Sequence, residues 1–324
     1  MSTLETTTEA ARRSLTGRRA RLGDLLLQGT AGLAALGAVV LVGLIAWKIV
    51  DGARLSLSTF GLGFVTHVGW DPVHLRFGAG SFLFGTVVTS VGALVLATPL
   101  AIGVALFLSE LAPPWIRGPV TSLVETLAAI PSVVIGFWGI LVLGPVLRDH
   151  VDPALHSALG FIPLFGPSTV GSNYFTAMIV LTIMILPIVS SISRELFLSV
   201  PAELKEGALG LGLTRWEMVR GVVLPYARGG VAAAMILGFG RAVGEAIAVA
   251  QVIGAFTGTS WNLFNPGNTL GAQIALNYQG ASSGLELSSL VYLALILLVF
   301  SVFVNLLAQL IVRRAARRHG LVGR

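Results

Sequence analysis

The stretch FLFGTVVTSVGALVLATPLAIGVALFL (residues 82–108) contains no charged side chain and lies in an uncharged interval between Arg76 and Glu110. A helix needs about 20 consecutive apolar residues to cross the hydrocarbon core of a bilayer. The stretch therefore predicts a transmembrane helix. Only 11% of the 324 residues are charged, whereas soluble domains usually contain about 25% charged residues. This composition excludes an ordinary soluble globular protein.

Five more stretches are long and apolar enough to cross a membrane: residues 29–47, 126–147, 174–192, 229–256 and 289–312. The sequence thus predicts an all-α polytopic membrane protein with six transmembrane helices. We expect one additional short helix in residues 269–278, between the last two spans. The predicted organisation is an N-terminal tail (1–27), a first transmembrane helix (28–50), an outer loop (51–81), a core with the other five transmembrane helices (82–312) and a basic tail (313–324).

The basic residues indicate how these helices are oriented. Cytoplasmic loops of membrane proteins carry an excess of Lys and Arg. With the N-terminus placed inside, the inner segments hold sixteen basic residues and the outer loops hold three, Arg54, Arg76 and Arg148. We therefore expect a multi-pass protein of the plasma membrane, surrounded by lipid, with both termini cytoplasmic. The formal net charge of +6 follows from this distribution and favours no nucleic-acid partner.

Several classes of site have no counterpart in the sequence. The chain has no cysteine, which excludes disulfides, iron–sulfur clusters and thiol chemistry. A phosphate-binding P-loop needs Gly-x-x-x-x-Gly-Lys-Ser/Thr, but the two lysines, Lys48 and Lys205, lie in the contexts WKI and LKE. The five histidines show no metal-binding spacing. We expect no metal site, no cofactor and no catalytic residue, so the chain is not predicted to be an enzyme.

The predicted topology leaves one long cytoplasmic loop between the fourth and fifth spans, residues 200–226 (the long loop). Glu203–Leu209 favours a short helix that ends at glycine. Thr214 and Glu217 match a capping box, which predicts a second short helix, and we expect Pro225 to end that helix. Two short helices joined at glycine form a compact knob. Such a knob either packs against the membrane surface or docks a cytoplasmic partner.

The long loop resembles a known motif. Its residues Glu206-Gly207-Ala208, Gly212 and Val222-x-Leu224-Pro225 match the E-A-A-x3-G-x9-I-x-L-P loop of ABC importer permeases, with Gly207 in place of Ala and Val222 in place of Ile. The resemblance implies the type I ABC importer permease fold, in which this loop forms a coupling helix for an ATPase subunit. It also implies a turn at Gly212, a contact between Glu206 and the ATPase, and a coupling site that includes Gly207, Ala208, Gly212, Leu224 and Pro225.

Three stretches narrow the resemblance to the PstC family of permease subunits of the phosphate-specific ABC importer: residues 128–145 (AAIPSVVIGFWGILVLGP), 201–231 and 238–254 (GFGRAVGEAIAVAQVIG). The similarity covers residues from about 80 to 312. It implies that the chain translocates inorganic phosphate inward across the bacterial inner membrane, driven by ATP hydrolysis in other subunits. The implied partners are a PstA-like second permease in a heterodimer, two copies of a PstB-like ATPase and an extracytoplasmic PstS-like phosphate-binding protein.

Two charged residues, Arg241 and Glu245, stand four positions apart in the predicted fifth span. Residues at this spacing lie on one helix face, close enough for an ion pair. A charge at mid-membrane costs about 2.5–3.5 kcal/mol on insertion scales, so such residues usually face a protein interior or a water-filled pathway. The pair either clips spans together or offers phosphate a balanced positive charge, because Arg binds phosphoryl oxygens through two hydrogen bonds. The resemblance implicates both residues in transport.

Three other functions stay open from the residues alone. A permease for another oxyanion, sulfate or molybdate, has the same architecture. An ion-coupled secondary transporter that uses Arg241 and Glu245 as a proton relay is a second alternative, but it has no need of a docking loop. A membrane scaffold that transports nothing is the third.

Overall fold

The computed structural model describes residues 18–168 and 170–318, which are almost entirely helical. The chain divides into two compact units, with the boundary after Gly52. Six helices in the described residues are long and apolar enough to cross a membrane, as predicted. The fold class of an all-α polytopic protein is therefore confirmed.

The helix α2 (Arg18–Phe60) extends beyond both ends of the predicted first span, residues 28–50. In the first unit, all side chains from Gly23 to Ile45 are exposed, many of them Leu and Val. A helical stretch that is largely apolar all round and has no buried face, as residues 23–45 are, suits a lipid environment.

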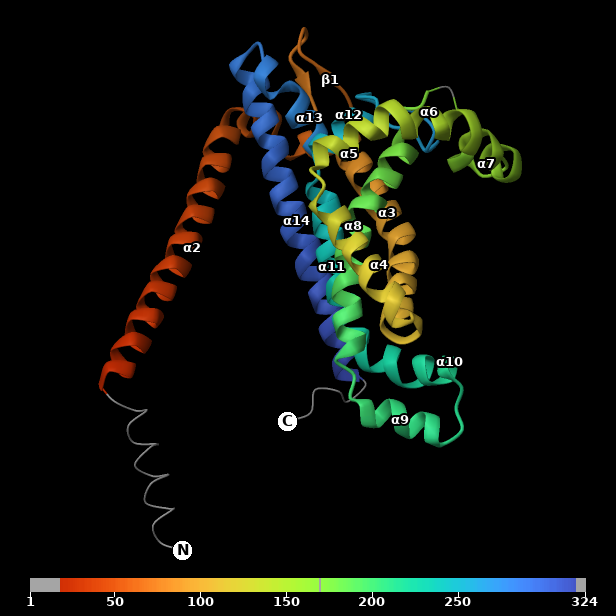
Figure 1. The fold of residues 1–324 in the computed structure, drawn as a ribbon. Coiled ribbons are helices and arrows are strands. Elements are labelled where there is room, and N and C mark those ends of the chain that lie inside the picture. Colours follow the sequence, from red (N-terminus) through yellow and green to blue (C-terminus); the bar gives the residue numbers. More distant parts are fainter. Residues whose placement is uncertain (1–17, 169, 319–324) are drawn as a thin grey trace, which may run out of the picture. The chain divides into compact units, whose positions relative to one another are not determined.

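Four helices build the core of the second unit (Figure 1): α3 (Gly80–Leu106), α8 (Tyr174–Leu198), α11 (Leu224–Gly244) and α14 (Gly284–Arg318). The helix α3 packs along α8 and α11, and α11 also packs against α14. One face of α3 carries a fully buried small side chain at every fourth position: Ala93, Ala97, Ala101 and Ala105. Small side chains let membrane helices approach closely, so this stripe joins α3 to the core.

Shorter elements connect these four helices. The helical ones are α4 (Pro114–Ala129), α5 (Ser132–Trp138), α6 (Gly144–Val146), α7 (Asp152–Leu159), α9 (Ala202–Gly210), α10 (Arg215–Met218), α12 (Ile247–Val252) and α13 (Leu270–Asn277). The π-helical turns are η2 (Phe107–Leu111), η3 (Gly139–Leu143), η4 (Leu147–Val151) and η6 (Val219–Val223). The 3₁₀ turns are η1 (Gly61–Val65), η5 (Pro163–Phe165) and η7 (Tyr278–Gly280).

The boundaries predicted for the third span, residues 126–147, are wrong because the chain breaks at Pro131. The helix α4 ends before this residue and α5 begins after it. Proline lacks a backbone N–H and drives the preceding residue into an extended conformation, as seen at Ile130 with ψ of 127°. In Figure 1, α4 runs beside the bundle, which it contacts through α8, whereas the run from α5 to α7 crosses the end of the bundle.

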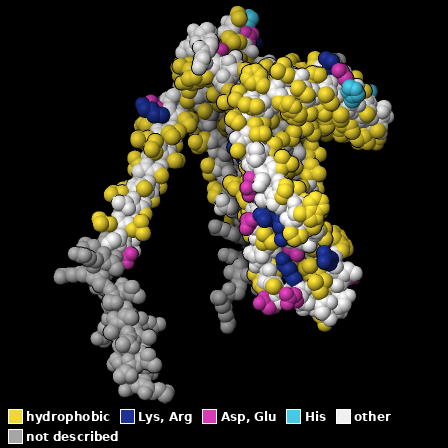
Figure 2. Space-filling model, in the orientation of Figure 1, with side chains coloured by type: hydrophobic (Ala, Val, Ile, Leu, Met, Phe, Trp, Pro, Cys, Tyr) yellow, Lys and Arg dark blue, Asp and Glu magenta, His cyan; other side chains and the backbone are white. Residues whose placement is uncertain are grey.

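The two ends of the second unit carry different structures. Hydrophobic side chains cover the flanks of the bundle, and Lys, Arg, Asp and Glu gather over α9 and α10 at one end (Figure 2). The other end carries α13, which confirms the short helix predicted for residues 269–278, and an antiparallel hairpin of β1 (Trp70–Asp71) and β2 (Arg76–Phe77). The charged knob of α9 and α10 therefore lies at one end of the bundle, and α13 and the hairpin lie at the other.

The hairpin turn is closed by Asp71. Its Oδ1 accepts hydrogen bonds from the backbone N–H groups of Val73 and His74, and its Oδ2 lies 2.7 Å from His74 Nδ1. The backbone hydrogen bond from His74 is the main reason why the pKa of the Asp71 carboxyl lies below its ordinary value. These contacts are therefore present above the ordinary pKa of Asp, about 3.9, and are lost as the pH falls through the lowered value.

Gly85 marks a close approach between α3 and the segment before α13. A Cβ atom at this position would overlap the backbone oxygen of Asn268. We expect Gly85→Ala to lower the free energy of unfolding by about 1–3 kcal/mol, the usual cost of overpacking a core. Gly103→Ala is the matched control, because it lies on the same helix with nothing within 4 Å of the added carbon. Thermal unfolding of the detergent-solubilised protein measures both variants, and equal midpoints would contradict the close approach.

Candidate functional site

The long loop folds into two helices joined by a glycine turn, as the sequence predicts. Gly212 has φ of +86°, a conformation that costs glycine nothing because it has no Cβ. The backbone N–H of Gly212 donates to the oxygen of Leu209, and the N–H of Leu213 donates to the oxygen of Ala208. This pair of hydrogen bonds is a Schellman motif, which ends α9 and satisfies its last carbonyl groups.

The capping box that begins α10 is confirmed. Thr214 Oγ1 accepts a hydrogen bond from the backbone N–H of Glu217 at 3.3 Å, and Glu217 Oε2 accepts one from the backbone N–H of Thr214 at 2.8 Å. Both groups would otherwise lack partners at the start of a helix. The second helix of the knob is therefore held by its own local sequence.

Pro225 does not end the second helix, which corrects the sequence prediction. Instead α10, η6 and α11 form one helical segment from Arg215 to Gly244. The missing N–H of a proline would break a regular α-helix, but the wide π-helical turn from Val219 to Val223 precedes it. Such turns often mark functional sites. The knob is thus continuous with a membrane-spanning helix, so a displacement of α10 reaches α11 directly.

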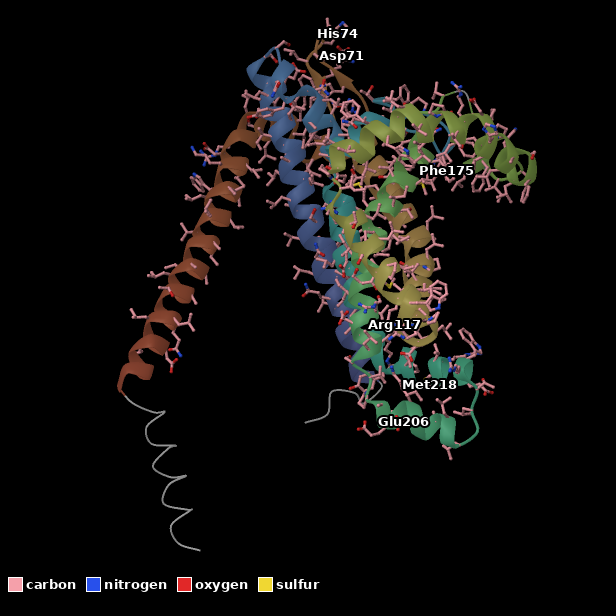
Figure 3. The ribbon with its side chains drawn as sticks, in the orientation of Figure 1. Asp71, His74, Arg117, Phe175, Glu206 and Met218 are labelled. Atoms are coloured by element: carbon pink, nitrogen blue, oxygen red, sulfur yellow. The ribbon has the colours of Figure 1, made fainter. Side chains whose placement is uncertain are left out.

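The residues of the proposed coupling motif divide between an exposed and a buried face. Glu206 and Gly207 are exposed on α9, whereas Ala208 is buried against a cluster that includes Met218 (Figure 3). Beside the motif, Leu211 and Trp216 are 85% and 64% exposed. Leu224 and Pro225 form the first turn of α11. The exposed face combines a carboxylate with large apolar side chains, a composition suited to a protein partner.

The fifth predicted span, residues 229–256, is interrupted beside its charged pair. The helix α11 ends at Gly244, Glu245 is extended with ψ of 125°, and α12 begins at Ile247. Glu245 Oε1 accepts a hydrogen bond from the backbone N–H of Ala248 at 3.2 Å, so the side chain caps α12. The prediction that Arg241 and Glu245 share one helix face is therefore wrong, and no ion pair joins them in the described part of the chain.

Each charge has a helix terminus of its own. Arg241 lies in the last turn of α11 and Glu245 lies just before α12. A helix terminus attracts charge through its macrodipole, cations at the C-terminus and anions at the N-terminus. This arrangement lowers the cost of both charges without pairing them. The guanidinium of Arg241 has no hydrogen bond or ion pair among the described residues, and its side chain is exposed.

Arg241 and Glu245 nevertheless line one groove, of about 570 Å³ (the Arg241 groove). Residues of α8, α11 and α14 supply its other walls: Ile188, Ile236, Leu237, Gly240, Gly244 and Asn305. Asn305 is not among the site residues predicted from the sequence. Its Nδ2 donates to the backbone oxygen of Ser301 at 2.9 Å, and its Oδ1 lies beside Gly240. Two amides in the apolar sixth span, Asn305 and Gln309, were the available signal, because a polar group in lipid is costly.

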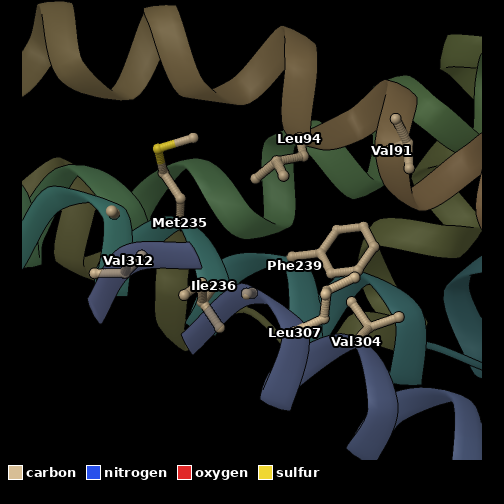
Figure 4. A pocket seen from close by; sticks show the side chains of 10 residues that line it. Val91, Leu94, Met235, Ile236, Phe239, Val304, Leu307 and Val312 are labelled. Atoms are coloured by element: carbon tan, nitrogen blue, oxygen red, sulfur yellow. The ribbon is translucent and has the colours of Figure 1, made fainter. Parts of the chain in front are cut away.

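A second groove between α3, α11 and α14 differs in its chemistry (Figure 4). It measures about 380 Å³, and all ten side chains that line it are apolar, among them Val91, Met235, Phe239 and Leu307. Without a cation or a hydrogen-bond donor side chain, it offers an anion no partner. Of these two grooves, only the Arg241 groove has the chemistry to bind an anion.

Comparisons with known proteins agree with this arrangement. A family model described as binding-protein-dependent transport system inner membrane component matches residues 97–317. Phosphate transport system permease protein PstC of Mesorhizobium japonicum is 42% identical over 312 residues, with 95% of each chain covered. The protein of that name from Pasteurella multocida is 40% identical over 301 residues, covering 92% of this chain and 94% of the relative.

A solved structure supports the fold independently. The bacterial alginate ABC transporter, in complex with a periplasmic protein that holds an alginate pentasaccharide, contains a chain similar to this one at a TM-score of 0.57. The alignment covers 93% of this chain and 99% of that chain, at 18% identity. The likeness at this identity concerns the fold, which is that of a type I ABC importer permease.

Proposed function

Because the chain belongs to the PstC family of phosphate transport permeases, a branch of the binding-protein-dependent transport system inner membrane components, we propose that it carries inorganic phosphate inward across the bacterial inner membrane. It is a multi-pass permease subunit and not a catalytic subunit. Phosphate as the substrate is supported by one observation: Arg241 is exposed and, among the described residues, unpaired, and it lines a groove of the membrane-spanning bundle. Its planar guanidinium suits a phosphoryl group.

The proposed assembly has four kinds of subunit. The chain pairs with a PstA-like second permease, two copies of a PstB-like ATPase bind the long loop, and a PstS-like protein delivers phosphate at the opposite end. Both termini and the long loop are then cytoplasmic, as the excess of basic residues in those segments favours. The ATPase subunits hydrolyse ATP, so this chain needs no ATPase site, metal or cofactor of its own.

The proposed coupling runs through the helix that joins the long loop to the Arg241 groove. When the ATPase dimer closes, it moves α10, and α11 moves with it because the two form one helical segment. Arg241 lies 17 residues after Leu224, about 25 Å along the helix axis. The motion then opens or closes the path at the groove. The Glu245 side chain lines the same groove, and a carboxylate beside Arg241 weakens anion binding enough for release, as conduction requires.

Uptake competition tests the substrate. Proteoliposomes that contain the purified complex are expected to accumulate labelled phosphate only with ATP, and excess unlabelled phosphate, but not sulfate or molybdate, should suppress the signal. Stronger suppression by sulfate or molybdate would assign the protein to another oxyanion. Uptake that continues without the ATPase and stops with a protonophore would identify a secondary transporter, and no uptake of any of these anions would support a scaffold.

A further inference from the structure

A nearly buried ion pair ties the long loop to α3. Lys205 Nζ on α9 donates a hydrogen bond to Glu110 Oε1 at 2.6 Å and another to the backbone oxygen of Phe197 at 3.0 Å. The Lys205 and Glu110 side chains are 17% and 9% exposed. Glu110 belongs to η2, which continues α3, and Phe197 belongs to the last turn of α8. One ammonium group therefore joins three elements.

This ion pair differs from a nearby one on the surface. Arg194 and Glu195 are neighbours in sequence, and the Glu195 side chain is 69% exposed. Exposed pairs of that kind contribute little to stability. Lys205 and Glu110 are 95 residues apart in sequence, and removal of one partner from a buried pair strands the other charge. A displacement of α9 away from Glu110 would break the pair and leave a buried charge without a partner. The pair therefore constrains the position of α9.

Apolar packing alone holds α9 weakly. Ala208 is the one buried side chain on this helix, and it is small. The segment that receives the ion pair is itself fixed, because Arg117 Nη2 donates to the backbone oxygens of Ser109 and Ala112 on either side of Glu110. The helix α9, with one small buried side chain, is thus tied by a charged contact to a turn that has its own hydrogen bonds.

We propose that Lys205 and Glu110 are positioning residues that make α3 move together with α9 when the ATPase displaces the long loop. The helix α11 follows the loop through its continuous backbone, whereas α3 has no backbone connection to the loop. Ala105 of α3 shares an apolar cluster with Ala208 of α9, and the ion pair adds the charged contact that fixes α9 to the end of α3. The alanine stripe then carries the motion from α3 into the packed core. This inference rests on the proposed function, because a displacement of the loop by ATP requires an ATP-driven importer.

Spin labels test this link without reference to the substrate. The chain has no cysteine, so Ala202→Cys on α9 and Val95→Cys on the exposed side of α3 provide two labelling sites in the full complex. Val95 lies 16 residues before Leu111, about 24 Å along the helix, so its label is well removed from the end of η2 that the ion pair joins to α9. With the native pair, we expect a narrow distance distribution that stays the same with and without ATP and vanadate.

Variants that break the ion pair are expected to change the distance distribution between the two labels. Lys205→Met and Glu110→Gln should each broaden or shift the distribution, and the double swap Glu110→Lys with Lys205→Glu should restore it. Glu195→Gln, which breaks the exposed pair, is the matched control and should change nothing. Unchanged distances in both single variants, or a swap that restores no more than the singles, would overturn the proposal.

Phosphate transported per ATP hydrolysed is the functional readout. We expect both single variants to retain the ATPase on purification but to move about tenfold less phosphate per ATP, because a stranded buried charge disfavours the docked arrangement. An unchanged ratio would contradict the positioning role. Failure of the proposed function has a different signature, since the unmodified complex then moves no phosphate while the EPR distances still report on the link.

Discussion

Arg241→Gln is expected to lower phosphate uptake more than a hundredfold while the importer still assembles. Glutamine keeps much of the side-chain volume but removes the positive charge and the planar set of donors. A hydrogen bond to a charged group contributes about 1.5–3 kcal/mol, and Arg makes two such bonds to a phosphoryl group. A loss of about 3 kcal/mol corresponds to more than a hundredfold in rate. Because Arg241 is exposed, its removal strands no buried charge in this chain.

Initial rates of ATP-dependent uptake in proteoliposomes measure this effect, and co-purification with the ATPase verifies assembly. Arg241→Lys keeps the charge but loses the two-pronged geometry, so an intermediate rate is expected. Arg228→Gln makes the same change near the other end of α11, outside the Arg241 groove, and should change the rate by less than about twofold. Normal uptake by Arg241→Gln would remove Arg241 from the pathway, whereas failure to assemble would support a structural clip to a partner subunit.

The spans could be predicted from the sequence where the apolar run coincides with an unbroken helix, as in α3 and α8. Breaks were harder to place because a proline does not decide them alone. Pro99 and Pro187 lie inside α3 and α8 without ending either helix, since neighbouring groups can satisfy the freed carbonyls in a membrane protein. Pro131, by contrast, separates α4 from α5. The difference is set by tertiary surroundings that the local sequence does not contain.

The same distinction divides the candidate site. The turn at Gly212 and the capping box of Thr214 and Glu217 depend on residues within five positions of each other, so their sequence pattern predicts them. The helix α11 ends before Glu245, where the Glu245 side chain caps the next helix, α12. The spacing of four between Arg241 and Glu245 instead predicted that one helix continues through both residues, which is wrong. Asn305 reaches the Arg241 groove from a different helix. Contacts of this kind arise from packing between helices, and a single sequence does not reveal them.

Glu206→Lys is expected to prevent the ATPase from co-purifying with the permease, while the permease still inserts and folds. Glu206 is exposed on α9 at the charged end of the bundle (Figure 3), so the substitution disturbs no internal contact. If this carboxylate meets a complementary surface on the ATPase, reversing its charge juxtaposes like charges, which costs several kcal/mol. A loss of about 3 kcal/mol weakens binding more than a hundredfold, beyond what survives purification.

Two control variants test whether the loss of ATPase binding is specific to Glu206. Glu195→Lys makes the same charge reversal at the end of α8, on a side chain that is 69% exposed, and is expected to retain the ATPase. Lys205→Met removes the anchoring contact one residue earlier on α9 and should also retain the ATPase while reducing coupling. Retention by Glu206→Lys would exclude Glu206 as a docking contact, and loss in all three variants would indicate general electrostatics. A loss confined to Glu206→Lys would separate docking, on the outward face of α9, from force transmission on its inward face.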